Sequence, residues 1–390
     1  MKSEFMYTPL DEIYNKELRR QASTVELIAS ENFVSPRVLK YLGSEFTSKY
    51  TEGYPGKRYY GGCEFYDELE TYCQELWKDV FSTTYHVNVQ PHSGTSANLA
   101  AISAVVNPGE TILSMNLDCG GHLSHGARVS QVGKLYNIVN YGVDDDGWID
   151  YDKVAKLADQ CQPKLIICGA SAYSRKIDYI RFAEIARSVN AYLLADIAHV
   201  AGLIAVNKLP SPFGYADIIT STTQKTLRGP RGGLIFCIPE LAKKIDSAVF
   251  PGTQGGSLMN VIAAKAACAE EVLEPEFIDY IDEVMYNAKA MAARFMSHGY
   301  NVITDGTDNH MFLVDLRGTG LTGIDVQNEL ERNGITLNKN AIPNDPLPPS
   351  KTSGIRIGTP AMTTRGWKSY NFCECADNIC KTLNEMRAAL

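Results

Sequence analysis

Hydrophobic and polar positions follow the period of a helix in the segment 66–81, YDELETYCQELWKDVF. Its apolar side chains stand at positions 66, 69, 73, 76, 77 and 80, which is the spacing of one face of an amphipathic helix. From about residue 86, short runs rich in β-branched residues alternate with helical stretches such as YIRFAEIARSVN. The runs that predict strands are ETILSMN, KLIICG, AYLLAD, ADIITST and GGLIFC. This alternation predicts a mostly parallel β-sheet covered by helices on both faces.

The pattern changes again after about residue 272. Helices are predicted near 276–298, in IDVQNELERNG and near 366–389, and extended runs in NVIT, HMFLVDL, ITLNKN and GIRIGTPA. These elements predict a smaller α+β domain. We therefore divide the chain into an N-terminal arm (1–60), a large domain (61–272) and a small domain (273–390). Within the arm, the aromatic and glycine-rich stretch YTEGYPGKRYYGG is expected to form an exposed loop with a function.

Composition and charge narrow the class of protein. The chain has 390 residues, 45% of them hydrophobic, which is enough for a large core and more than one globular unit. Its 37 basic and 45 acidic residues give a net charge of -8 without a basic block, so nucleic acid is not an expected partner. No run of about 18 apolar residues and no signal-peptide core occur, so we expect a cytoplasmic protein that does not bind membranes. The ten cysteines lack zinc-ribbon and CxxC spacing and are interpreted as reduced, packed thiols rather than metal ligands.

Polar residues follow the predicted parallel strands at their carboxyl ends, where ligands collect in sheets of this kind. The residues concerned are Ser171 after KLIICGA, Asp196 at the end of AYLLAD with His199 three residues later, and Thr222, Gln224 and Lys225 at the end of ADIITST. A carboxylate at the end of a buried strand needs a cationic or hydrogen-bonding partner. A lysine in a partly desolvated pocket has a lowered pKa and can attack a carbonyl to form a Schiff base.

Ser93, Gly94 and Thr95 stand directly before a predicted helix in VNVQPHSGTSANLAAISAVV. A helix N-terminus offers unpaired N–H groups to a phosphate, although an ordinary helix cap explains the same residues. Neither GxxxxGK(S/T) nor GxGxxG occurs, so the phosphate would not belong to a nucleotide in those cradles. A phosphate cradle, a carboxylate and an amine together fit pyridoxal phosphate, whose protonated pyridine nitrogen would pair with Asp196. A structural ion pair between Lys225 and Asp196 fits the spacing equally well.

Over nearly its whole length the chain resembles the serine hydroxymethyltransferase family. The motifs that carry the resemblance are, in order, ELIASENFVSPRV, TEGYPGKRYYGGCE, VQPHSGTSAN, GGHLSHG, ADIAHVAGLIA, TQKTLRGPRGG and TSGIRIGTPAMTTRG. The resemblance implies a pyridoxal-phosphate enzyme of the α/β class with the aspartate-aminotransferase fold, fold type I. In that fold a large domain with a mostly parallel seven-stranded sheet is followed by a smaller C-terminal α+β domain.

The resemblance also implies roles for individual residues around the cofactor. Lys225 would form the Schiff base, Asp196 would pair with the pyridine nitrogen, His199 would lie by the phenolic oxygen and His122 would stack on the ring. Ser93, Gly94 and Thr95 would hold the phosphate. Further residues expected at the cofactor or in catalysis are Ser171, Thr222 and Gln224, and, contributed by a partner subunit, Tyr50, Gly255 and Gly256. Such sharing implies an obligate homodimer.

The substrate side of the site is implied in the same way. Arg356 in GIRIG would bind the carboxylate of the amino acid, aided by Ser30, because a guanidinium binds a carboxylate through two parallel hydrogen bonds. Glu52 would act as the acid–base group and Tyr54 and Tyr60 would line the pocket, all from the arm loop of the neighbouring subunit. A carboxyl group with this task is expected to have a pKa raised by partial burial. Contacts with folate or substrate are implied for Leu117, Gly121, Leu123, Asn340 and Arg231.

The implied reaction converts L-serine and tetrahydrofolate reversibly into glycine and 5,10-methylenetetrahydrofolate, through aldimine and quinonoid intermediates. Three other functions fit parts of the pattern. They are an aldolase or transaldolase acting on threonine-like substrates with folate optional, a cofactor-free binding homologue, and a transaminase on the same fold. The retained Glu52, Leu117, Leu123 and Asn340 argue against the aldolase.

The sequence departs from the family pattern at several positions. Gln224 replaces the usual histidine before the Schiff-base lysine, and because glutamine cannot become cationic, we expect altered rate or substrate tolerance with hydroxymethyl transfer intact. Cys119, Ser257 and Asn260 are smaller departures, the last two near the segment FPGTQGG. The chain also ends soon after its last predicted helix, earlier than typical members.

Overall fold

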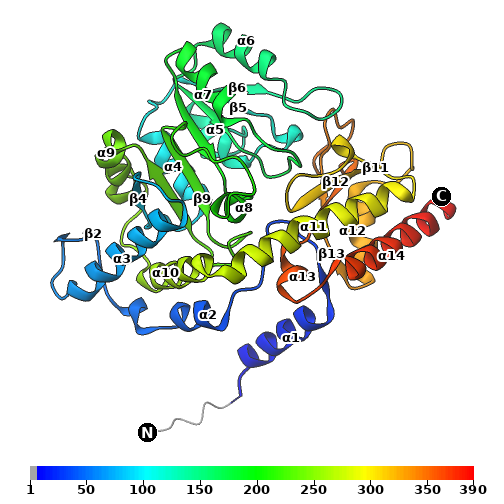
Figure 1. Cartoon of the computed structure of the whole chain (residues 1–390), viewed down its shortest axis with the longest axis horizontal. Helices are drawn as coiled ribbons and strands as arrows, with labels where there is room; N and C mark the ends of the chain where they lie inside the picture. Colours follow the sequence, from blue (N-terminus) through cyan, green and yellow to red (C-terminus); the bar gives the residue numbers. More distant parts are fainter. Residues whose placement is uncertain (1–6) are drawn as a thin grey trace.

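The computed structural model describes residues 7–390 and has a seven-stranded sheet at its centre (Figure 1). Residues 1–6 of the predicted arm lie outside the described part. The strand order is β4-β10-β9-β8-β7-β5-β6, and neighbours are parallel except at β10, which is antiparallel to both β9 and β4. The strands are β4 (His86–Asn88), β5 (Thr111–Met115), β6 (Asn137–Tyr141), β7 (Leu165–Cys168), β8 (Tyr192–Asp196), β9 (Ile218–Thr222) and β10 (Gly233–Cys237). The predicted mostly parallel sheet is confirmed.

Helices cover both faces of this sheet, and its side chains alternate between two hydrophobic cores. In β8, Leu193 and Ala195 belong to one core and Leu194 to the core on the other face. Helices α3 (Glu64–Val80), α7 (Tyr179–Ser188) and α10 (Met259–Leu273) contribute to the first core, and α4 (Gly94–Ser103) contributes to the second. With both faces buried, polar side chains concentrate at the strand ends.

A second, four-stranded antiparallel sheet carries the C-terminal part of the chain, with the order β11-β12-β15-β14. Its strands are β11 (Asn301–Val302), β12 (Met311–Asp315), β14 (Asn338–Asn340) and β15 (Gly354–Gly358), and its main helices are α12 (Gly323–Arg332) and α14 (Ser369–Ala388). The long helix α11 (Pro275–Ser297) joins the two parts, because Phe277 packs in the core of the large sheet and Phe295 in the core of the small one. The mostly parallel sheet and the smaller α+β unit predicted from the sequence are therefore both present. The domain boundaries at 60 and 272 stay predictions.

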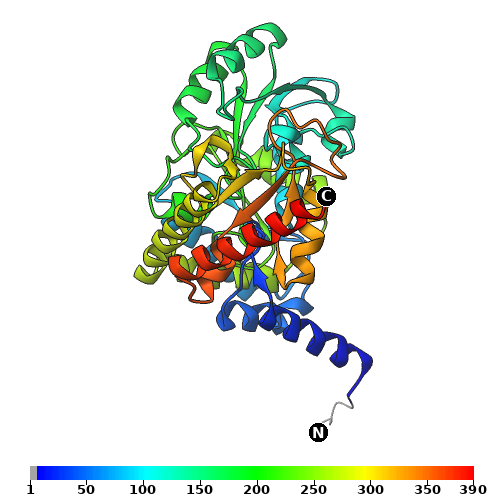
Figure 2. The ribbon, with the colours of Figure 1, turned by 90° about the vertical axis from the view of Figure 1, so that its right-hand side faces the viewer.

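Part of the N-terminal segment packs against the small sheet, although the sequence pattern predicted a separate arm. β1 (Val25–Glu26) pairs in parallel with β13 (Ile335–Thr336), and Leu27 is fully buried in the core of the small sheet. By contrast, α1 (Pro9–Ser23) has no buried residue and projects from the body of the molecule (Figure 2). The exposed apolar side chains of α1 are Leu10, Ile13, Tyr14 and Leu18.

The other α-helices and strands of residues 7–390 are α2 (Pro36–Leu42), β2 (Gly53–Tyr54), β3 (Lys57–Arg58), α5 (Gln131–Leu135), α6 (Tyr151–Cys161), α8 (Ala201–Ala205), α9 (Ala242–Ser247) and α13 (Pro360–Thr364). The helix predicted over 66–81 begins two residues earlier, at Glu64, where acidic side chains favour the first turn. None of the helices between residues 7 and 390 has the length and apolar character needed to cross a membrane.

Candidate active site

A cavity of about 410 Å³ opens where the parallel strands of the large sheet end. It is bounded by the segments after β7, β8 and β9, by the first turn of α4, by β15 and by the N-terminal segment. The predicted residues that line it are Ser30, Ser93, Gly94, Thr95, Leu117, Gly121, His122, Leu123, Ser171, Asp196, His199, Thr222, Gln224, Lys225, Arg231 and Arg356. The fold thus brings together residues that are far apart in the sequence.

Lys225 lies three residues after the end of β9 and is only 9% exposed. Burial lowers the pKa of its amine to about 8, while the charge of Asp196 opposes this shift. Its backbone is held in place, because its carbonyl oxygen accepts hydrogen bonds from the Asn32 side chain at 2.8 Å and from the Arg228 N–H at 3.2 Å. An amine with this pKa has an unprotonated, nucleophilic fraction near neutral pH.

Asp196 ends β8 and is held by several donors. One carboxylate oxygen accepts a hydrogen bond from Asn98 Nδ2 at 2.8 Å and lies 2.9 Å from His125 Nε2, and the other accepts from the Ala198 N–H at 3.0 Å. Burial acts to raise the pKa of Asp196, but the hydrogen bond and charge of His125 outweigh it, so the pKa lies below its ordinary value. Among residues 7–390 no ion pair joins Asp196 to Lys225, so the structural ion pair considered from the spacing is not formed.

Helix α4 presents its N-terminus to the cavity. Ser93 is its cap, since the Ser93 hydroxyl accepts a hydrogen bond from the Ser96 N–H at 3.1 Å. A Cβ atom at Gly94 would lie 2.5 Å from Cγ2 of Thr222, so glycine allows the close approach of α4 to the end of β9. The cap interpretation and the anion-site interpretation are therefore compatible, because the capped turn itself lines the cavity.

Two histidines of the cavity are neutral at pH 7. Burial lowers the pKa of His122 to about 4, and its Nδ1 atom lies 2.7 Å from Ser124 Oγ. Burial also lowers the pKa of His199 well below its ordinary value, and the His199 ring stacks on that of His310 with 5.5 Å between ring centroids. Both residues therefore offer uncharged aromatic faces.

Arg356 brings a buried guanidinium to the cavity from β15. Its Nη1 atom donates to the backbone oxygen of Ser171 at 2.6 Å, and its Nε atom donates to Asn338 Oδ1 at 3.2 Å. Burial lowers the pKa of Arg356 to about 10, so the group stays cationic. No carboxylate within the described residues forms an ion pair with it, and a carboxylate from a ligand would fill that role.

Several predicted site residues gather elsewhere, in what we call the arm-loop cluster: Tyr50, Glu52, Tyr60, Gly255 and Gly256. The rings of Tyr50 and Tyr60 meet edge to face at 5.6 Å, and both side chains are exposed. The two glycines lie against Glu52. None of the five lines the cavity around Lys225. The cluster is thus a second assembly of predicted residues on the same chain.

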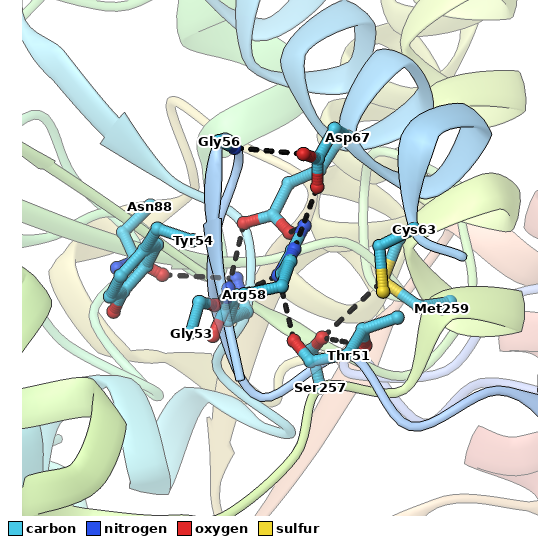
Figure 3. A network of polar contacts seen from close by, with 12 residues as sticks. Thr51, Gly53, Tyr54, Gly56, Arg58, Cys63, Asp67, Asn88, Ser257 and Met259 are labelled. Carbon is cyan, nitrogen blue, oxygen red and sulfur yellow. Dashed lines mark hydrogen bonds and ion pairs between the residues drawn. The ribbon is translucent and has the colours of Figure 1, made fainter. Parts of the chain in front are cut away.

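Arg58 fixes the backbone on both sides of Glu52 (Figure 3). Its Nη1 atom donates to the backbone oxygens of Thr51 and Gly53, each at 2.8 Å. The guanidinium also pairs with Asp67 at 2.8 Å and with Glu70 at 2.6 Å, and the side chains of Arg58 and Glu70 are 3% and 0% exposed. The loop is consequently anchored to α3 by a buried ion pair, while its side chains Tyr50 and Tyr60 are exposed.

Two further predicted residues lie outside the cavity. The Tyr54 hydroxyl donates to the backbone oxygen of Asp246 at 2.7 Å and accepts a hydrogen bond from Asn88 Nδ2 at 3.0 Å, so it points into its own chain. Asn340 ends β14, and its Nδ2 atom donates to the backbone oxygen of Ala341 at 2.6 Å. Their predicted substrate contacts stay predictions.

Comparison with known proteins identifies the family. The family model described as serine hydroxymethyltransferase matches residues 6–379. A serine hydroxymethyltransferase of Halorhodospira halophila is 55% identical over 372 residues, covering 95% of this chain and 89% of the relative. The serine hydroxymethyltransferase 2 of Pseudomonas savastanoi pv. phaseolicola is 56% identical over 375 residues, covering 95% and 90%.

The chain belongs to the serine hydroxymethyltransferase family. Members of this family are pyridoxal-phosphate-dependent transferases with tetrahydrofolate as co-substrate and the fold of type I. The predicted fold class, enzyme class, cofactor and serine hydroxymethyltransferase function are therefore confirmed, and the aldolase alternative is not supported.

The residues of the cavity fit pyridoxal phosphate. The Oγ1 atom of Thr222 is buried, lines the cavity and has no hydrogen-bond partner within residues 7–390. The narrow cradle at Gly94, the ionised Asp196 and the amine of Lys225 add the donor, acceptor and nucleophile that a phosphorylated pyridine aldehyde requires.

Sequence reasoning missed three residues that position this site: Asn32, Asn98 and His125. Asn98 and His125 hold Asp196, and Asn32 holds the backbone of Lys225. A signal for His125 was present, because GGHLSHG contains two histidines three residues apart and both line the cavity.

Proposed function

We propose that the cavity around Lys225 catalyses the interconversion of serine and glycine with tetrahydrofolate as the one-carbon acceptor. The observation that carries this proposal is the arrangement of one amine of lowered pKa, one carboxylate that stays ionised and one buried guanidinium without a carboxylate partner. When bound, pyridoxal phosphate would supply an aldehyde that joins to an amine and a ring that withdraws electron density from the substrate Cα atom.

Each protein group has a task in that reaction. Arg356 binds the substrate carboxylate and so sets the orientation of the Cα substituents, because the planar guanidinium donates two parallel hydrogen bonds to a carboxylate in one plane. Asp196 stays ionised because of its lowered pKa, and it would balance the positive charge of a protonated ring nitrogen when the cofactor is bound. Lys225, largely protonated at pH 7 but near its pKa, can give up a proton and act as a nucleophile.

The folate side of the site is supported by two exposed leucines. Leu117 and Leu123 line the cavity and are 39% and 50% exposed. Apolar side chains at the mouth of a polar cavity suit a planar aromatic ligand that enters after the amino acid. They favour the folate-dependent reaction over the aldolase with folate optional.

We further propose that the complete site needs a second copy of the chain. The arm-loop cluster carries Glu52, the predicted acid–base group, but does not line the cavity of its own chain. The apolar face of α1 is also without a covering element within residues 7–390. In a homodimer, the arm-loop cluster of each protomer would complete the cavity of its partner. The cytoplasmic location stays a prediction from the sequence.

The proposal is tested by two measurements on the purified enzyme. Borohydride reduction followed by peptide mapping is expected to label Lys225 with the cofactor. Glycine formation from serine is expected to depend on tetrahydrofolate. A label at another lysine would overturn the assignment of the amine. Equal glycine formation without folate would favour the aldolase.

A further inference from the structure

Lys265 is a buried lysine on α10 to which the proposed reaction assigns no task. It is 1% exposed, and its Nζ atom donates to three backbone oxygens, those of Val89 at 2.7 Å, Gly233 at 2.8 Å and Pro91 at 3.0 Å. No carboxylate within residues 7–390 forms an ion pair with it. An ammonium group has three hydrogens, so all of its donors are satisfied by main-chain carbonyls.

The three carbonyls belong to two strand ends that flank the cavity. Val89 and Pro91 follow β4 in the short segment that leads into Ser93 and α4, and Gly233 is the first residue of β10. The two ends also contact each other directly, since the Gly233 N–H donates to the Pro91 oxygen at 3.0 Å. Lys265 therefore ties the segment before the α4 turn to the start of β10.

The start of β10 is in turn paired with the segment that carries Lys225. Gly233 lies opposite Thr222 in the sheet, and the Thr223 N–H donates to the Gly232 oxygen at 3.2 Å. One ammonium group thus connects, through a single strand end, the turn at Ser93 and the segment from Thr222 to Lys225.

The surroundings of Lys265 are shaped for a long cation. A Cβ atom at Gly232 would lie 2.3 Å from Cε of Lys265, so the glycine leaves room for the end of the side chain. Burial lowers the pKa of Lys265 to about 8, while the charge of Glu70 opposes this shift, so the group remains protonated at neutral pH. An apolar side chain of the same length would leave three inward-facing carbonyls without this donor.

We propose that Lys265 is a positioning residue that fixes the α4 turn at Ser93, Gly94 and Thr95 relative to Lys225. One ligand can then place its phosphate at the turn and its aldehyde at Lys225 at the same time. This inference rests on the proposed function, because it assumes that the turn binds the cofactor phosphate. A displacement of the turn by a fraction of an ångström would weaken contacts to the phosphate while leaving Lys225 able to react with the aldehyde.

The test compares the affinity of the full-length chain, stripped of cofactor, for pyridoxal phosphate and for pyridoxal, which has the aldehyde but no phosphate. Lys265→Met is expected to lower the preference for the phosphorylated ligand at least about tenfold. Val272→Ala, a cavity-forming change on the same helix, is the control, because Val272 is buried but its side chain has no donor for the three carbonyls. It is expected to lower the melting temperature with the preference unchanged.

A second variant keeps the test decisive if Lys265→Met does not fold. Gly232→Ala retains the lysine charge but pushes its Cε atom away, and it is expected to reduce the same preference. A folded Lys265→Met, or failing that a folded Gly232→Ala, with a preference within about twofold of the unchanged chain would overturn the role of Lys265. If the unchanged chain itself shows no preference for the phosphorylated ligand, the assignment of the α4 turn as phosphate site fails instead.

Discussion

The cavity at the strand ends and the arm-loop cluster differ in how much of their chemistry one chain completes. In the cavity, Lys225 and Arg356 are buried and the Asp196 side chain is 11% exposed. All three are held by neighbours of the same chain and have pKa values shifted by burial or by those neighbours. In the arm-loop cluster, the backbone around Glu52 is equally well held, but Tyr50 and Tyr60 are exposed. The fold of one chain completes the cavity, whereas the arm-loop cluster is an ordered surface that one chain leaves exposed.

The difference shows that rigidity and completeness are separate properties. Arg58 and Glu70 anchor the loop by a buried ion pair, as Asn98 and His125 hold Asp196 by hydrogen bonds. Only the cavity, however, removes its reactive groups from water.

Arg58→Met should disrupt the anchoring of the arm loop and have the largest effect of the changes proposed. Glu70 would remain buried without its partner, so we expect the free energy of unfolding to fall by about 3–5 kcal/mol. Where the variant folds, turnover should fall while bound cofactor is retained. Denaturant unfolding and cofactor absorbance measure the two effects.

The control for Arg58→Met is Arg181→Met, which removes an arginine whose ion pairs with Asp152 and Glu184 are exposed. Its stability should be close to that of the unchanged chain. Similar losses in both variants would show that the buried pair does not anchor the loop.

Arg356→Lys should weaken substrate binding in the cavity, with a smaller effect than Arg58→Met. A lysine keeps the charge but loses the planar pair of donors, so we expect KM for serine to rise about 100-fold, with little change in stability. Arg317→Lys, at a half-exposed site paired with Asp315 on the small sheet, should leave KM unchanged. An unaltered KM in Arg356→Lys would remove this residue from the substrate site.

Much of the cavity was predictable because its residues stand at fixed places in a regular architecture. Asp196 ends β8 and Lys225 follows β9, so the strand pattern alone brings them to one edge of the sheet. The polar neighbours were harder, because Asn98 is mid-helix and its contact with Asp196 depends on the packing of α4 against β9. Strands β4 and β6 were also missed by pattern, since β4 has three residues and β6 is only partly buried.

The composition of the arm loop predicted a functional role, but the sequence did not predict which residues its side chains contact. The stretch YTEGYPGKRYYGG predicted an exposed functional loop, yet nothing in the sequence pattern states that Arg58 reaches Glu70 or that Gly255 and Gly256 lie beside Glu52. Contacts between segments about 200 residues apart depend on tertiary packing, and the sequence resemblance supplied the roles without the geometry.

Glu26→Gln tests how completely the N-terminal segment is buried, and we expect a modest effect on stability that depends on pH. Burial, together with the charge of Glu31, raises the pKa of Glu26 from 4.5 to about 7. The folded chain therefore binds this proton more tightly than the unfolded chain, so stability falls as pH rises from 4.5 to about 7, and the full penalty remains above 7.

Because glutamine does not titrate, Glu26→Gln should gain about 1–3 kcal/mol relative to the unchanged chain between pH 5 and pH 8. Denaturant unfolding of both proteins at the two pH values measures this. Parallel changes in the two proteins would show that Glu26 is not buried as a carboxyl, and that burial in the N-terminal segment is incomplete in solution.

Gln224→His should have the smallest effect and probes the edge of the cavity. Gln224 Oε1 accepts a weak hydrogen bond from the Gly232 N–H at 3.4 Å, which a histidine ring can replace only in one tautomer. We expect turnover and the ratio of serine to threonine-like substrates to change a few-fold. Equal turnover and selectivity in the two proteins would refute a role for the glutamine.

The claim that one complete site draws on two chains is tested most directly by mixing two inactive variants. Lys225→Ala leaves its arm-loop cluster intact, and Glu52→Ala leaves its cavity intact. After random exchange of subunits, about one quarter of all sites would combine a native Lys225 with a native Glu52 from the partner. We predict recovery of about one quarter of the activity of the unchanged enzyme, and a mixture no more active than its separate components would contradict the account.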